Sequence, residues 1–243
     1  TGPLTIGHCR QAVLGEAVSR MLEALGFSVH REYYFNDAGR QMELLGQSLA
    51  ARYAEAAGIA GPELPEGGYR GGYMAAWAEE LLQRDGAGLR WPTDAGLFTG
   101  FARERAMETI RKDLSLLGIE FDRYFRESEL LKGAVEEAIN RLRQAGEGLV
   151  YEDGEGKLWL RLSQLGRPED RVIVRRNGMF TYRMPDIAYH LDKFQRGFDP
   201  IVDVFGSDHL DTSRDVRAAL EAVLGEEEVD RRLRIILHQF VTL

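Results

Sequence analysis

The first part of the chain constrains the fold most, because two structural periodicities follow one another directly. Between Ile6 and Leu25 apolar residues recur every three or four positions, which is typical of one face of a helix. Gly26 favours a helix end, and the aromatic-rich stretch 27–35 has the composition of a β-strand. A turn sequence, NDAG, precedes a second helical pattern over 40–57. We expect this succession to belong to a βαβ unit whose first strand lies before the chain.

The remaining sequence alternates helical and extended patterns around a β-rich middle. The dipeptide Asn177–Gly178 and the stretch 153–156 favour tight hairpin turns. The other predicted elements are, in order, a loop at 58–73, helices at 74–84 and 101–117, an extended segment at 119–125, a helix at 128–143, hairpins at 149–162 and 171–183, a helix at 185–194, a buried strand with its turn at 201–209, a helix at 212–224 and a strand at 233–243.

This order predicts an α/β protein with a parallel sheet and flanking helices, interrupted by a β-containing insertion. We assign residues 1–126 to the first half of a Rossmann-like nucleotide-binding domain with a helical insertion. Residues 127–178 form a connecting insertion, and residues 179–243 form the second half of the domain. The chain starts at Thr1 without a methionine and ends on an apolar run, so we interpret it as a fragment of a longer protein.

Composition restricts the environment and the partners. The net charge of −8 provides no global basic field, so an RNA partner would need a local patch or further domains. The single cysteine, Cys9, excludes an internal disulfide and fits a reducing compartment. No apolar run approaches the roughly 20 residues that span a bilayer. We expect a cytoplasmic monomer without a membrane partner.

The stretch GPLTIGH, at the start of the first predicted helix, is a candidate phosphate site. Backbone N–H groups at a helix start attract phosphate, and a glycine lets a nucleotide approach the backbone closely. A histidine there can donate a hydrogen bond to a phosphate that gains charge in the transition state. The alternative is that these residues form only a turn and a helix cap. The candidate ATP-binding residues are Gly2, Pro3, Thr5, Gly7 and His8.

Tyr182 and Asp186 are candidates for binding a cation. Pro185 disfavours a helical conformation at Met184, so we expect Tyr182 to be extended and Asp186 to lie in the first turn of the next helix. Ligands of α/β proteins bind at the carboxyl ends of strands. A carboxylate there can hold a planar guanidinium through two parallel hydrogen bonds, whereas a lysine would offer only a point charge. The alternative is that Asp186 only complements the helix dipole.

A third candidate site is the turn GSDH, which follows the predicted strand at 201–205. Gly206 permits close approach of a ligand, and Asp208 can accept hydrogen bonds from ribose hydroxyls. His209 completes this set of ATP-binding candidates. A metal site formed by Asp208, His209 and His8 is an alternative, although no paired-histidine spacing supports it.

Further pocket candidates are Gln41 and Tyr189. Gln41 lies one helical turn beyond Asp37, on the same face, although NDAG alone is ordinary turn chemistry. Tyr189 follows Asp186 by three residues and could frame a pocket or simply pack. We interpret three other histidines as ordinary strand or helix residues: His30, His190 and His238.

Together these motifs resemble class I aminoacyl-tRNA synthetases. GPLTIGH before a long helix is similar to the His-x-Gly-His motif of that class, with Thr5 in the place of the first histidine. NDAGRQ narrows the resemblance to arginyl-tRNA synthetases. Three later stretches agree with it along almost the whole chain: FDRYFRES, TYRMPDIAYHLDKF and FGSDH. Because threonine carries no charge, the role of this first motif position is open, while that of His8 is not affected.

The resemblance implies a class I synthetase fold and a two-step reaction. L-Arginine would be activated by ATP with Mg²⁺ to arginyl-adenylate and then transferred to the 3′ end of tRNA(Arg). His8 and Thr5 would be catalytic, and the arginine would contact Tyr182, Asp186, Gln41 and Tyr189. The family's first core strand, lysine-rich loop, N-terminal tRNA-binding domain and anticodon-binding domain are expected outside this chain, which alone should be inactive. The alternatives are a small-molecule nucleotidylyltransferase and a non-catalytic arginine-sensing or RNA-binding paralogue.

Overall fold

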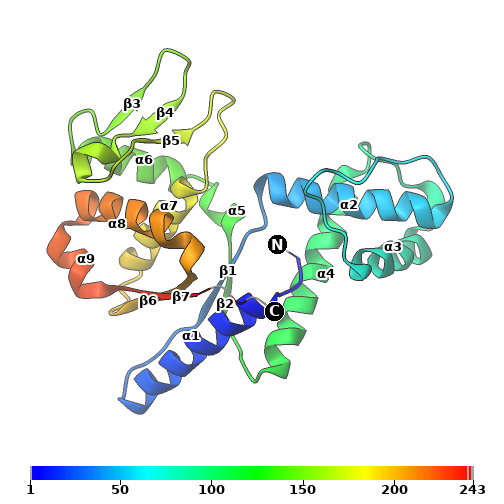
Figure 1. The fold of residues 1–243 in the computed structure, drawn as a ribbon, viewed down its shortest axis with the longest axis horizontal. Coiled ribbons are helices and arrows are strands. Elements are labelled where there is room, and N and C mark those ends of the chain that lie inside the picture. Colours follow the sequence, from blue (N-terminus) through cyan, green and yellow to red (C-terminus); the bar gives the residue numbers. More distant parts are fainter. Residues whose placement is uncertain (1, 240, 242–243) are drawn as a thin grey trace. The chain divides into compact units, whose positions relative to one another are not determined.

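The computed structural model describes residues 2–239 and 241, which divide into two compact units. Unit one comprises the described residues up to Val13 together with Leu22–Arg126, and unit two comprises Leu14–Met21 and the described residues from Glu127 onward. The long helix α1 (Ile6–Ala24) therefore contributes to both units. Figure 1 labels the helices and strands of each unit.

Helix α1 has almost the predicted bounds, but its apolar stripe is not buried. None of its residues is fully buried, and Ile6, Val13 and Met21 are about half exposed. The periodicity therefore predicted the secondary structure correctly, although it does not mark a core-facing surface in this structure.

Unit one contains the predicted parallel strand pair. Strand β1 (Glu32–Phe35) pairs with β2 (Arg123–Arg126) in parallel, with Glu32 opposite Arg123. Parallel strands need a long crossover connection, and three helices supply it here. The extended segments predicted at 27–35 and 119–125 are confirmed, but each strand is only four residues long.

The crossover helices have a core of their own. They are α2 (Gly39–Ala57), α3 (Gly72–Asp85) and α4 (Ala95–Leu116), and α2 packs against both of the others (Figure 1). Helix α4 begins six residues before the predicted start. The cause is tertiary packing, because Phe98 is buried and its ring packs edge-on against Tyr53 of α2, with centroids 5.2 Å apart.

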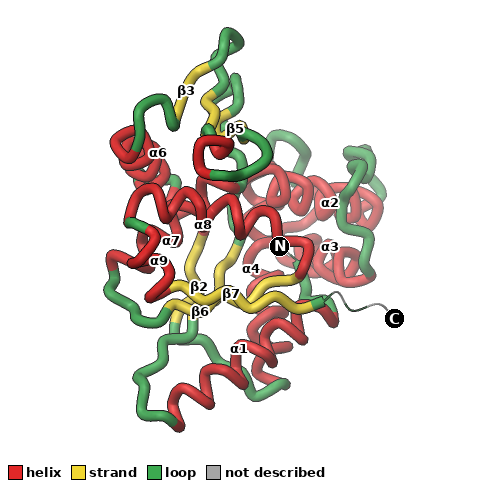
Figure 2. Tube along the Cα trace, turned by 60° about the vertical axis from the view of Figure 1, so that its left-hand side comes forward, coloured by secondary structure: helices red, strands yellow, loops and turns green. Residues whose placement is uncertain are grey.

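Unit two contains a second parallel pair, β6 (Ile201–Gly206) and β7 (Leu233–His238), with all six positions in register. Figure 2 shows these strands side by side. Helices α8 (Leu210–Leu224) and α9 (Glu226–Arg232) connect them. The predicted last strand extends to 243, but β7 ends at His238, and residues 240, 242 and 243 lie outside the described part of the chain.

An antiparallel sheet forms the β-rich middle of unit two. Its strands are β3 (Val150–Glu152), β4 (Leu158–Leu160) and β5 (Arg171–Val174), joined in that order. The first predicted hairpin is confirmed. The second is reduced to one bridge between Val174 and Phe180.

One predicted helix, at 128–143, is divided in the structure. It forms α5 (Glu127–Leu130) and α6 (Ala134–Ala145), separated at Gly133, whose φ of +115° does not fit a right-handed helix. Parallel strand pairs with helical crossovers confirm the α/β fold class, and the proposed domain bounds stay a prediction. No helix among the described residues is long and apolar enough to cross a membrane.

Asp215 of α8 joins three elements of unit two through one buried carboxylate. Its side chain is 2% exposed, and its oxygens accept hydrogen bonds from Nε of Arg167 (2.9 Å), Arg171 (3.3 Å) and Arg183 (3.0 Å). Arg171 lies on β5, and Arg183 lies at the start of helix α7 (Arg183–Gln195). Burial alone would raise the pKa of Asp215, but the three guanidinium groups hold it below its ordinary value.

We predict that Asp215→Asn lowers the free energy of unfolding at pH 7 by about 3 kcal/mol, because three half-buried guanidinium groups lose their counter-ion. A carboxyl group with a lowered pKa stabilises the fold above its unfolded pKa, and this contribution is lost as the pH falls through the folded pKa. Urea unfolding should therefore show a difference from wild type that shrinks below about pH 4.

The matched control is Asp211→Asn. This side chain is 76% exposed and lies 3.8 Å from Arg167 Nη2, so its loss should change stability little. Equal effects of the two substitutions would contradict a special role for Asp215.

Candidate active site

Thr5 and His8 form a reciprocal cap at the start of α1. The carbonyl of Thr5 accepts the first helical hydrogen bond from Cys9 N–H at 3.0 Å. The N–H of Thr5 donates to His8 Nδ1 at 3.0 Å, and the N–H of His8 donates to Thr5 Oγ1 at 3.5 Å. This is the geometry of a capping box with histidine at the third helical position. The helix therefore begins where it does because Thr5 can close its first turn.

The same contacts determine which nitrogen of His8 carries the proton. A backbone N–H can only donate, so Nδ1 must accept and is unprotonated. The Thr5 hydroxyl also lies 3.1 Å from Nδ1 and can donate to it. His8 is therefore a neutral imidazole with its proton on Nε2. Its outer nitrogen is a hydrogen-bond donor rather than a positive charge.

The two glycines of the motif differ in what requires them. Gly2 has φ +85°, and an added Cβ would lie 3.1 Å from Tyr69 Cε1, so both backbone and packing exclude a side chain. Among the described residues, an added Cβ at Gly7 would meet only Thr5 Oγ1, at 3.7 Å. Packing in this part of the chain therefore does not explain Gly7, and its assignment to ATP stays a prediction.

Tyr69 links the motif to Gln41 within unit one. Its ring packs against Gly2, and its hydroxyl donates to Gln41 Oε1 at 2.9 Å. Its N–H donates to Ser48 Oγ at 3.0 Å, which attaches the loop before α3 to helix α2. Sequence reasoning treated 58–73 only as a loop and missed this residue. The sequence signal that was available is the pair of glycines on each side of the dipeptide at 69–70, because glycines permit close packing of the backbone. The structure shows such packing, since an added Cβ at Gly68 would lie 2.7 Å from Ser48 Oγ.

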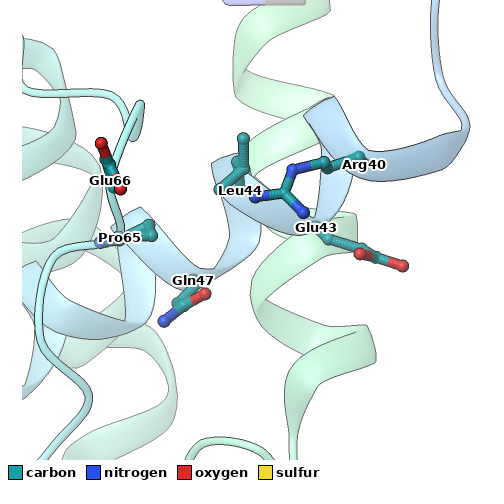
Figure 3. Close-up of a pocket in the computed structure, with 6 residues that line it drawn as sticks. All are labelled: Arg40, Glu43, Leu44, Gln47, Pro65 and Glu66. Carbon is teal, nitrogen blue, oxygen red and sulfur yellow. The ribbon is translucent and has the colours of Figure 1, made fainter.

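A cavity of about 180 Å³ lies beside the same helix, and Figure 3 shows its walls. None of the predicted site residues lines it. The residues come from α2 and from the loop that follows it: Arg40, Glu43, Leu44, Gln47, Pro65 and Glu66.

In unit two, helix α7 begins earlier than predicted. Tyr182 has φ −62° and ψ −17°, so the expectation that it is extended is wrong. The N–H groups of a first helical turn have no intrahelical acceptor, so Pro185 removes no hydrogen bond there. The predicted place of Asp186 is confirmed, since it lies in the first turn and donates its N–H to Tyr182 O at 3.3 Å. Tyr182 is 71% exposed, so its ring is accessible.

Asp186 lies in a strongly polar environment. Burial raises the pKa of its carboxyl group, and the positive charges of His190, Lys193 and His209 act in the opposite direction. Tyr189 is buried, and Lys193 Nζ lies 4.5 Å from the centre of its ring. Tyr189 therefore packs against Lys193, and whether it also lines a pocket stays a prediction.

In the turn after β6, the side chain of Asp208 lies close against the backbone of Gly206. A Cβ at this position would collide with Asp208 Oδ1, so the carboxylate folds back over the glycine. Asp208 and His209 are more than half exposed, and Asp208 Oδ2 lies 3.7 Å from His209 Nε2. The charge of His209 in this turn acts on Asp186 of α7 and opposes the rise of its pKa on burial.

The candidates thus form two sets, each within its own unit. The phosphate motif with Gln41 and Tyr69 belongs to unit one, and Tyr182, Asp186, Tyr189 and the turn at 206–209 belong to unit two. The metal alternative gains no support, because the described residues contain no group of three or more His, Cys, Asp or Glu side chains that could hold a metal ion.

Comparisons with known proteins agree with these motifs along the whole chain. It is 44% identical to an arginine–tRNA ligase of Desulfotalea psychrophila over 244 residues and 41% identical to that of Thermotoga maritima over 247 residues. All of the chain is covered in both, but only 43% and 44% of the relatives. The chain thus spans less than half the length of these curated relatives.

Solved structures show the same fold. A Campylobacter jejuni protein assigned as an arginyl-tRNA synthetase superposes with a TM-score of 0.89 at 33% identity, over 99% of this chain and 52% of that one. The Thermus thermophilus arginyl-tRNA synthetase has a TM-score of 0.65 at 20% identity, over 98% and 46% of the chains, and shows the fold alone. Residues 1–213 match the family described as tRNA synthetases class I (R), catalytic domain. The chain therefore belongs to this class I family, that of the arginyl-tRNA synthetases.

Proposed function

We propose that the complete protein containing this chain activates L-arginine with ATP and transfers it to the 3′ end of tRNA(Arg). The observation that carries this proposal is the match of the entire chain to arginine–tRNA ligases at 41–44% identity. It also argues against the small-molecule nucleotidylyltransferase alternative. A non-catalytic paralogue would fail arginine-dependent pyrophosphate exchange, so that assay on the complete protein with arginine, ATP and tRNA tests the proposal.

The first step is attack of the arginine carboxylate on the α-phosphorus of ATP, which releases pyrophosphate and forms arginyl-adenylate. His8 donates its Nε2 proton in a hydrogen bond to a phosphate oxygen that gains charge, and the N–H groups at the start of α1 add to this stabilisation. In the second step a terminal ribose hydroxyl of the tRNA attacks the acyl carbon and AMP leaves. Positioning and electrostatics supply the catalysis, because the protein forms no covalent bond.

Mg²⁺ would neutralise charge on the ATP phosphates. The described residues offer no cluster of three metal ligands, so phosphate oxygens and water would supply most of its coordination. The chain's own contribution is then the neutral donor His8 together with the turn at 206–209, where Asp208 accepts from the ribose of ATP.

Asp186 is the residue we assign to the guanidinium of arginine, with Tyr182 and Tyr189 beside it. Gln41 of unit one is a further arginine-binding candidate in this proposal. Its Oε1 accepts the Tyr69 hydroxyl at 2.9 Å, and its Nε2–H groups can donate.

We place the enzyme in the cytoplasm, on the basis of its role in protein synthesis and its single cysteine, Cys9. That it acts as a monomer stays a prediction.

We predict that His8→Ala lowers kcat for arginine-dependent pyrophosphate exchange by about 100-fold, the usual loss for one transition-state donor. The control is His30→Ala, a histidine outside the assigned site, which should leave kcat nearly unchanged. Unaltered exchange in the His8 variant would remove this residue from the mechanism.

We predict that Asp186→Asn weakens arginine binding by about 100-fold or more while ATP binding changes little, because a neutral amide cannot pair with the guanidinium. Calorimetry on the complete protein measures the affinity for arginine and the affinity for ATP.

Since the pKa of Asp186 is raised in the free protein, arginine affinity should increase with pH through that pKa, and the variant should lose this dependence.

The same substitution should not destabilise the free protein. A carboxyl group with a raised folded pKa stabilises the fold when protonated, and this contribution disappears as the pH rises through the folded pKa. At pH 7.5 the thermal midpoint of Asp186→Asn should therefore equal or exceed that of wild type. A clear decrease would indicate a structural role instead.

We predict that Tyr69→Phe raises the KM for arginine by about 2- to 10-fold, the range for one lost hydrogen bond, with the KM for ATP unchanged. Phenylalanine keeps the ring that packs against Gly2 and removes only the donor to Gln41. Tyr73→Phe is the control, because the Tyr73 hydroxyl also points to Gly2, 3.7 Å from its Cβ position. Identical kinetics of the two variants would contradict the role of the Tyr69 hydroxyl.

A further inference from the structure

His190 occupies a position in α7 that is chemically unusual for a buried histidine. Only 4% of it is exposed, and it lies one helical turn after Asp186. Its Nδ1 is 2.7 Å from the backbone oxygen of Asp186, and its Nε2 is 2.9 Å from Oδ2 of Asp203 on β6. Each ring nitrogen therefore lies within hydrogen-bond distance of an oxygen atom.

Neither of these oxygens can donate a proton. A backbone carbonyl only accepts, and Asp203 is ionised, because its other oxygen accepts from Lys193 Nζ at 2.5 Å. Burial would raise the pKa of Asp203, but Lys193 and His190 hold it below its ordinary range. With an acceptor at each end, the ring satisfies both contacts only when both nitrogens carry protons. His190 is then an imidazolium ion.

The charges around this ring balance when Asp186 is included. His190 and Lys193 contribute two positive charges and Asp203 one negative charge, so this buried trio has a net charge of +1. The Asp186 carboxylate brings the sum to zero, and His209 of the turn after β6 faces it from another element. A buried carboxylate is tolerated when cations compensate it in this way.

We propose that His190 is a charged positioning residue of the arginine site. Its Nδ1–H holds the backbone at Asp186, and its positive charge, together with Lys193, opposes the effect of burial on the ionisation of the Asp186 carboxyl group. This inference rests on the proposed function in one respect, the assignment of Asp186 to arginine. The charge state of His190 does not depend on that assignment.

The direct test is nuclear magnetic resonance of the complete protein with ¹⁵N-labelled histidine, without substrates, at pH 8. An ordinary histidine is neutral at this pH. We expect both ring nitrogens of His190 to carry protons in a long-range ¹H–¹⁵N spectrum, with the resonances assigned by their loss in His190→Gln. One unprotonated nitrogen in this ring at pH 8 would overturn the inference, whatever the enzyme does with arginine.

The functional test uses His190→Gln, which keeps a side-chain donor and loses the charge. We expect the KM for arginine to rise about tenfold, with kcat and the KM for ATP unchanged. The kcat/KM profile for arginine should also move to higher pH, because Asp186 loses a cationic neighbour, whereas a merely structural defect would lower all parameters together. His238→Gln is the control and should keep the wild-type profile.

The outcomes separate the two proposals. A neutral His190 with normal arginine kinetics overturns this inference and leaves the proposed function intact. A charged His190 in a wild-type protein that shows no arginine-dependent exchange overturns the proposed function, and with it the assignment of His190 to arginine binding.

Discussion

Compensation of buried carboxylates by cations is the interaction on which unit two depends. Asp203 joins β6 to α7 through His190 and Lys193, and Asp215 joins α8 to β5 and to the first residue of α7 through three arginines. Each carboxylate would be costly without its partners. Helix α7 is held by both clusters, one at its first residue and one at His190 and Lys193 in its second half, and Asp186 lies between these attachments.

Histidine serves two opposite purposes in this chain, and the hydrogen-bond partners decide which. His8 faces a backbone N–H, which makes its Nδ1 an acceptor and the ring neutral. His190 faces a carbonyl and a carboxylate, which make both nitrogens donors. The same side chain is thus neutral at one position and charged at the other because its hydrogen-bond partners differ.

Periodicity and turn chemistry predicted most elements because they are local properties. The predicted helices became α1, α2, α3 and α8 with small shifts, and the Asp153 turn formed the β3–β4 hairpin. The errors came from tertiary contacts or from one residue's conformation: Phe98 lengthened α4, and Gly133 divided a helix. Tyr182 was misplaced because a rule about residues before proline was extended into a first helical turn, where proline costs no hydrogen bond. The hydrogen bond from Tyr69 to Gln41 and the charged state of His190 could not be predicted, since they depend on partners 28 and 13 residues away in the chain.

The cap formed by Thr5 and His8 is complete within four consecutive residues. The first turn of α1 fixes the ring at Nδ1, and this contact orients the outer nitrogen of the imidazole. Under the proposed function such a donor is preorganised, so little reorientation is needed when charge develops on the phosphate. Thr5, an uncharged residue at the first motif position, would then act on the reaction through His8.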